Sequence, residues 1–108
     1  MQIPEDKRIT VIFRIEPGCL GPQGVEHVDK FCNGANKKLS QLHPGFVNWQ
    51  VVPRHDKTLP ELDYALRKRP LSREHASRYF AHFDMEIDKF EMSVFDDLPE
   101  MIDQFFGR

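Results

Sequence analysis

The sequence has only two cysteines, and no apolar stretch in it approaches the roughly 18 residues of a membrane-spanning helix. Two cysteines are too few to hold a domain of 108 residues by disulfides, so we expect both to be free thiols in a reducing cytoplasm. The first residues lack the apolar segment of a secretory signal peptide. These absences favour a cytoplasmic protein without a membrane anchor.

Motifs for catalysis and metal binding are also missing. The chain contains no P-loop, no G-x-S-x-G, no H-E-x-x-H and no EF-hand spacing. His75 and His82 lie on one predicted helix face, but no cysteine or carboxylate stands at ligand spacing from them. We therefore expect neither a metal nor another cofactor.

Charged residues are unevenly distributed along a chain whose formal net charge is only −2. That balance argues against general attraction to nucleic acid or to a membrane surface. Residues 54–78 are basic, whereas residues 79–108 carry two basic and eight acidic side chains. The two regions are expected either to attract each other within the fold or to form partner-facing patches, whose head-to-tail association would weaken with salt.

The clearest local pattern is a strand, a turn and a helix within residues 9–42. Apolar residues alternate over residues 9–16, which predicts a strand with one buried face. A turn rich in glycine and proline follows, and residues 23–42 place apolar side chains at the spacing of a core-facing helix. Residues 43–45 are expected to end that helix. Gly34, which costs a helix about 1 kcal/mol relative to alanine, predicts a close contact at its middle.

Patterns in the second half predict three more strands and two more helices. Strands are expected at residues 46–52, 62–67 and 88–95, and the first two should form a hairpin. A helix with Ser72 as its N-cap is expected to run to about residue 83. A last short helix covers residues 98–105.

The resulting order is β-α-β-β-α-β with a terminal helix, although residues 84–88 also fit a continuation of the second helix. With right-handed crossovers, this order predicts a ferredoxin-like plait. It would be one α+β domain over residues 1–108, with a four-stranded antiparallel sheet in the order 4-1-3-2 and two helices on one side. Because this fold hosts many unrelated functions, it indicates none of them.

The predicted plait leaves one face of its sheet open. Arg14 and Arg67 fall on that face of the two central strands, and Arg69 extends the basic run. Glu91 is expected beside Arg14, and Gln50 beside Arg67. These side chains either form ion pairs on a solvated face or bind a small anionic ligand or a second copy of the chain. Nucleic acid is not expected, because the aromatic residues of the central strands face the core.

Cys19 is the one position where reactive chemistry is plausible. It lies in the turn just before the predicted helix, whose N-terminus would favour a thiolate, and His27 is the nearest base. Cys32 lies on the core stripe, and no Cys-x-x-Cys is present. Cys19 is therefore either a catalytic candidate together with His27 or a small turn residue with no chemical role.

We therefore predict a non-enzymatic cytoplasmic domain that binds through its open sheet face as a homodimer. The alternative is a small enzyme or a thiol-dependent sensor that uses Cys19. The two differ in what they need: a binding module needs a flat exposed surface, whereas an enzyme needs a concave pocket with a perturbed titratable group.

Overall fold

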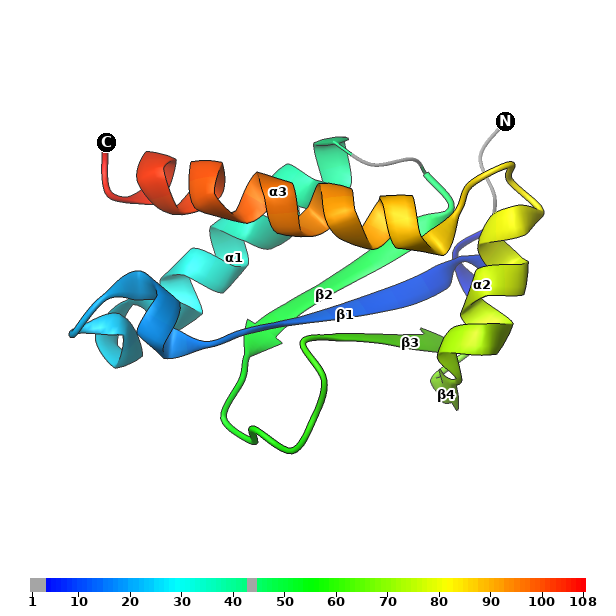
Figure 1. Cartoon of the computed structure of the whole chain (residues 1–108), viewed down its shortest axis with the longest axis horizontal. Helices are drawn as coiled ribbons and strands as arrows, with labels where there is room; N and C mark the ends of the chain where they lie inside the picture. Colours follow the sequence, from blue (N-terminus) through cyan, green and yellow to red (C-terminus); the bar gives the residue numbers. More distant parts are fainter. Residues whose placement is uncertain (1–3, 43–44) are drawn as a thin grey trace.

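The computed structural model describes residues 4–42 and 45–108, and it has a mixed α+β fold with a four-stranded sheet and three helices. The helix stop expected at His43 and Pro44 lies outside the described residues. Figure 1 shows helices α1 and α3 running over the same side of the sheet, with α2 at one end of it. None of the helices within the described ranges is long and apolar enough to cross a membrane.

The first half of the sheet is a β-α-β unit made of β1 (Ile9–Ile15), α1 (Gly24–Leu42) and β2 (Val47–Pro53). The two strands are parallel, with Ile9 opposite Val47. The side chains of β1 alternate strictly between two faces. Its odd-numbered residues are at most 1% exposed, while those between them are partly exposed. The strand and the helix predicted within residues 9–42 are therefore confirmed.

The second half of the sheet lies on the other side of β1. β3 (Leu62–Leu66) pairs antiparallel with β1, and the short β4 (Arg69–Leu71) pairs antiparallel with β3. The strand order is β2-β1-β3-β4. The predicted hairpin of residues 46–52 with residues 62–67 is wrong, because α1 returns the chain to one side of β1 and leaves the other side for β3.

Residues 88–95 form no strand, so the expected order 4-1-3-2 and the wholly antiparallel sheet of the plait are not what the chain adopts. They belong to α3 (Ile87–Phe105), one continuous helix that includes Pro99. Phe90 and Val94 are buried four residues apart, which is the helical period, whereas Met92 between them is 63% exposed. The apparent alternation of apolar residues was produced by this one exposed methionine.

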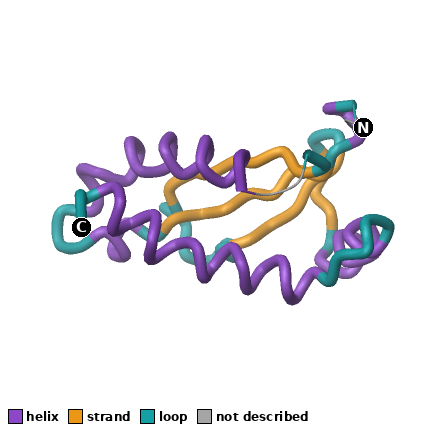
Figure 2. The backbone as a smooth tube through the Cα atoms, turned by 90° about the horizontal axis from the view of Figure 1, so that it is seen from above, coloured by secondary structure: helices purple, strands orange, loops and turns teal. Residues whose placement is uncertain are grey.

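Helix α2 (Arg73–Ala81) begins where the sequence predicts, because the Ser72 side chain accepts a hydrogen bond from the His75 backbone N–H. Figure 2 shows α2 beside the start of α3 at one end of the sheet. Aromatic rings join these helices to the strands. The Trp49 ring stacks on Phe90 with centroids 5.8 Å apart, and the Phe90 ring lies 4.6 Å from that of Phe80. The core therefore lies between one sheet face and the helices.

The close approach predicted at Gly34 is found at Gly24 instead. A Cβ added at Gly34 would meet no described atom within 4 Å. A Cβ at Gly24 would lie 1.7 Å from the Pro17 carbonyl oxygen, so the backbone of the turn before α1 passes directly over this glycine. The glycine that lowers helix propensity and the glycine that packing requires are therefore different residues.

Candidate binding surface

One face of the sheet is not covered by any described helix, and we call it the open face. Direct strand partners share a face, so the register identifies its members from the even-numbered residues of β1. Most of these side chains are partly exposed. The open face consists of Thr10, Ile12, Arg14, Asn48, Gln50, Val52, Asp63, Ala65 and Pro70.

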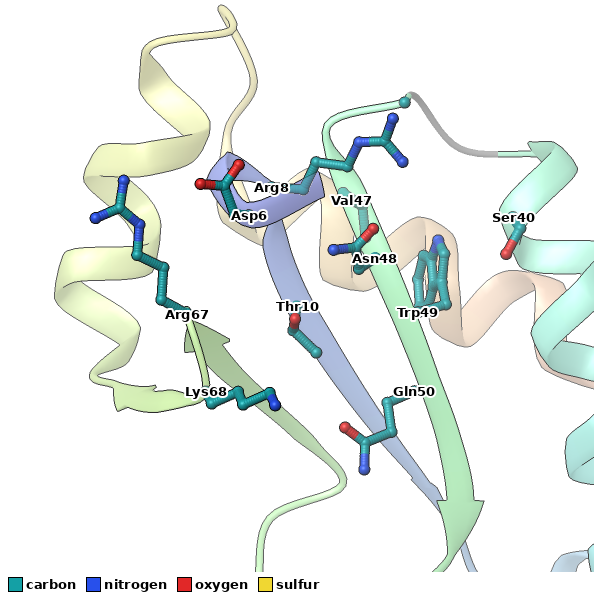
Figure 3. Close-up of a pocket in the computed structure, with 11 residues that line it drawn as sticks. Asp6, Arg8, Thr10, Ser40, Val47, Asn48, Trp49, Gln50, Arg67 and Lys68 are labelled. Atoms are coloured by element: carbon teal, nitrogen blue, oxygen red, sulfur yellow. The ribbon is translucent and has the colours of Figure 1, made fainter. Parts of the chain in front are cut away.

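A depression of about 1200 Å³ begins at one end of the open face and continues around the outer edge of β2, where Val47, Trp49 and Ser40 line it on the covered side. Figure 3 shows Lys68 reaching over the sheet toward Gln50, with Thr10 between them on β1. The remaining polar lining includes Asp6, Arg8, Ser40, Asn48 and Arg67. Gln50 and Arg67 both line this depression, but they are not side by side as predicted, because β1 lies between β2 and β3.

The tip of the β3–β4 hairpin supplies the basic side of this depression. Arg67 and Lys68 form its two-residue loop between the paired Leu66 and Arg69. Both have positive φ, 53° and 67°, as a type I′ turn requires, although such turns favour Asn-Gly. A left-handed conformation costs an L-residue about 1–2 kcal/mol. Neither side chain makes a hydrogen bond or ion pair with any residue that the structure describes.

Arg14 lies on the open face as predicted, but its charge is neutralised within the chain. One guanidinium nitrogen donates to the Pro60 carbonyl at 2.9 Å and to the Asp63 carboxylate at 3.3 Å. The Arg14 side chain is only 13% exposed. It therefore fixes the loop before β3 against the sheet, and little of it is left to bind a ligand.

Glu91 is not beside Arg14, because it lies on α3, on the covered side of the sheet. Its carboxylate accepts a hydrogen bond from the Tyr64 hydroxyl at 2.5 Å and one from the Arg73 guanidinium at 2.9 Å. Arg73 also pairs with Asp88. Burial and the bond to Glu91 both raise the pKa of Tyr64. Arg73, from the basic middle of the chain, is therefore paired with acidic residues of α3 within the fold. This agrees with one of the two interpretations of the charge distribution.

Arg69 is directed differently from Lys68. It pairs with Leu66, which shares the covered face with Ile9, and it lines a second depression of about 650 Å³ together with Lys7. Lys68 itself was not predicted as a site residue. Only a turn signal between residues 66 and 69 could have identified it, and the sequence there lacks the usual Asn-Gly.

Both outer edges of the sheet carry features that oppose pairing with another strand. On β2, the Val51 backbone N–H donates to the Asn36 side chain of α1 at 3.2 Å, and Pro53 ends the strand without a donor. On β4, the middle residue is Pro70, which also has no N–H. Such devices are typical of edges protected against strand addition.

Cys19 is exposed but does not have the surroundings of an activated thiol. It lies in a 3-10 turn, Pro17–Leu20, that ends before α1 begins at Gly24. Partial burial, followed by the charges of Glu61 and Glu16, raises the pKa of its thiol. A thiolate is therefore disfavoured at this position.

His27 shares no hydrogen bond with Cys19 among the interactions of the described residues. Its ring packs edge-on against Phe105 and Phe106, with centroids 6.0 and 5.5 Å away. Cys32 is buried, and burial raises the pKa of its thiol to about 12. The catalytic pair predicted from the sequence gains no support from this geometry.

Metal ligands do not gather in the parts of the chain that the structure describes, where no group of three or more His, Cys, Asp or Glu side chains could hold an ion.

Comparisons with protein families, curated proteins and solved structures find no match. Any inference about function therefore depends on the geometry of the open face and its depression.

Proposed function

We propose that this chain is a non-enzymatic binding domain that acts through the open face of its sheet, with a second copy of the chain as its partner. The observation that carries the proposal is the asymmetry of the sheet: its odd-numbered β1 residues are buried under helices, while the opposite face is covered by no described element. A sheet face left bare over four strands is a surface suited to a partner.

The composition of the open face supports a symmetric pairing of two such faces. Ile12, Val52 and Ala65 form a diagonal apolar stripe through its middle, and Gln50 and Asp63 lie directly beside Ile12. The Arg14–Asp63 ion pair lies toward one end. Apolar area bordered by polar side chains is the usual anatomy of a protein interface. A two-fold axis would place each apolar stripe against its copy.

The protected edge strands β2 and β4 favour a dimer contact through the open face rather than through the edges of the sheet. Asn36 occupies one backbone donor of β2, and Pro70 removes one from β4. Carbonyl groups of a strand added at either edge would therefore find no backbone donor at these positions. A dimer is therefore expected to stack two sheets rather than extend one.

The proposal is tested by sedimentation with a matched pair of variants. The wild-type chain is expected at twice its mass of 12.7 kDa. Ile12→Lys puts a charge at the centre of the open face and should give a folded monomer. Met92→Lys puts the same charge on an exposed position of α3 and should leave the dimer intact. A wild-type chain that sediments as a monomer would contradict the proposed partner.

The alternative of a small enzyme or thiol-dependent sensor at Cys19 stays a prediction, with less support because the pKa of that thiol is raised. The cytoplasmic location also stays a prediction from composition.

A further inference from the structure

We infer that the depression at the hairpin end of the open face binds the phosphate group of a small phosphomonoester. Arg67 and Lys68 would neutralise its charge, and Thr10 and Gln50 would donate hydrogen bonds to it. This inference rests on the proposed function, because it assigns a ligand to part of the same face.

The chemistry of the lining matches a tetrahedral oxyanion. Lys68 offers a compact charge that reaches over the sheet, and Arg67 offers a planar fork of donors that Figure 3 shows directed away from Gln50 and that would turn toward a bound phosphate. Arg8 also lines the depression, and Asp6 is its one acidic member. Amide and hydroxyl donors on β1 and β2 add neutral hydrogen bonds from the floor. Arg67 and Lys68, which pair with no described residue, make this end of the face more positive than the chain as a whole, whose net charge is −2.

The two cations are available because the fold does not use them. Arg14, Arg73 and Arg78 each pair with a carboxylate, whereas Arg67 and Lys68 pair with no described residue. Both also sit in a left-handed turn that Asn-Gly would adopt with less strain. Strained residues of this kind cluster where a side chain must be held in a particular place, ligand clamps included.

The size and lining of the depression favour a small phosphorylated molecule over a nucleic acid. Its lining runs from Lys68 across Thr10 to Gln50, which is farther than a bare phosphate reaches, so an attached organic group can lie along it. Single-stranded nucleic acids need aromatic side chains on which bases stack. Trp49, the aromatic side chain of the lining, is already stacked on Phe90. The central-strand aromatics Phe13 and Tyr64 are buried on the covered face, at 1% and 2% exposure.

Binding is measured by NMR titration of the full chain with adenosine 5′-monophosphate, inorganic phosphate and adenosine, at a salt concentration of about 50 mM. The double variant Arg67→Asn/Lys68→Gly removes both cations while giving the turn its preferred residues, so it should keep the fold. Arg67→Gln/Lys68→Gln is a second variant that leaves the backbone preference nearer to the original. Lys30→Gln/Lys89→Gln removes two cations from helices α1 and α3 as the matched control.

We expect the monophosphate to bind with a Kd below about 1 mM, inorganic phosphate more weakly, and adenosine not at all. Both turn variants should weaken monophosphate binding at least about tenfold, and the control by less than about twofold. The inference is overturned if adenosine binds as well as the monophosphate, if either turn variant binds like the wild type, or if a single-stranded oligonucleotide binds more tightly than the monophosphate.

Sedimentation of the same samples separates the two proposals. A monomer that binds the monophosphate would retain this site and refute the proposed partner. A dimer that ignores the monophosphate at concentrations up to about 10 mM would refute this site and retain the partner.

Discussion

The Tyr64 hydroxyl donates a hydrogen bond to the Glu91 carboxylate at 2.5 Å and so joins the sheet to α3. The same carboxylate accepts from Arg73 at the start of α2. One acidic side chain therefore holds β3, α2 and α3 together on the covered side of the sheet. Within this network the charges of Arg73 and Glu91 neutralise each other, so neither is available to the open face.

Tyr64→Phe should lower the free energy of unfolding by about 1–3 kcal/mol, because the hydroxyl is buried and its partner is charged. Urea unfolding measures the change. Tyr79→Phe is the control: its hydroxyl donates to the Lys7 backbone carbonyl at 2.7 Å in a more exposed place, so its loss should cost less. Equal costs for the two variants would contradict the role given to the Tyr64 bond.

Stability should fall as the pH rises above about 10, the ordinary pKa of a tyrosine. Burial and the bond to Glu91 raise the pKa of Tyr64 in the folded chain, so the unfolded chain loses this proton first. The contribution is fully present below pH 10 and is lost above it, with a slope approaching about 1.4 kcal/mol per pH unit. Unfolding curves between pH 8 and 11 measure it.

The comparison that isolates this residue is wild type against Tyr64→Phe. Cys32, whose thiol pKa is raised to about 12, contributes equally to both proteins. The variant should therefore lose only the part of the alkaline slope that belongs to Tyr64. Parallel curves for the two proteins between pH 10 and 11 would show that Tyr64 titrates alike in the folded and unfolded chains.

Two glycine-to-alanine substitutions in α1 should have opposite effects. Gly24→Ala forces a Cβ onto the Pro17 carbonyl and should cost about 1–3 kcal/mol. Gly34→Ala places a methyl group where no described atom lies within 4 Å, so it should gain about 0.5–1 kcal/mol from helix propensity. Thermal unfolding checks both. A stabilising Gly24→Ala would refute the close packing of the turn on α1.

Cys19 should react with iodoacetamide no faster than a free cysteine at pH 8. Burial and the nearby Glu61 and Glu16 raise the pKa of its thiol, which lowers the thiolate fraction. The rate is followed by mass spectrometry, and Cys32, which is buried, should remain unmodified in the folded chain. A Cys19 that reacts many times faster than free cysteine would revive the thiol-dependent alternative.

The sequence predicts well those parts of the fold whose pattern has only one interpretation. Alternation in β1, the apolar stripe of α1 and the Ser72 cap each correspond to an observed element. The pattern around Met92 has two interpretations, because apolar residues at 90, 92 and 94 fit a strand and those at 90, 94 and 101 fit a helix. Burial, which only the packed chain reveals, decides between them.

The candidate site was harder to predict, because it depends on the order of strands. Gln50 and Arg67 were placed near each other by a sheet order that the chain does not adopt. In the structure β1 lies between β2 and β3, and the two residues line the same depression from opposite sides of β1. Lys68 was missed because the strand ends one residue earlier than predicted and the turn lacks glycine. Arg14 was placed on the correct face, but its bond to Asp63 could not be read from spacing alone.

Isotope-filtered NOE spectroscopy on a mixture of labelled and unlabelled chains shows most directly whether two copies of this chain meet through their open faces. If they do, we expect intermolecular NOEs to the methyl groups of Ile12, Val52 and Ala65. Intermolecular NOEs confined to the exposed Met92 of α3, or none at all at concentrations of about 0.5 mM, would contradict the proposed pairing.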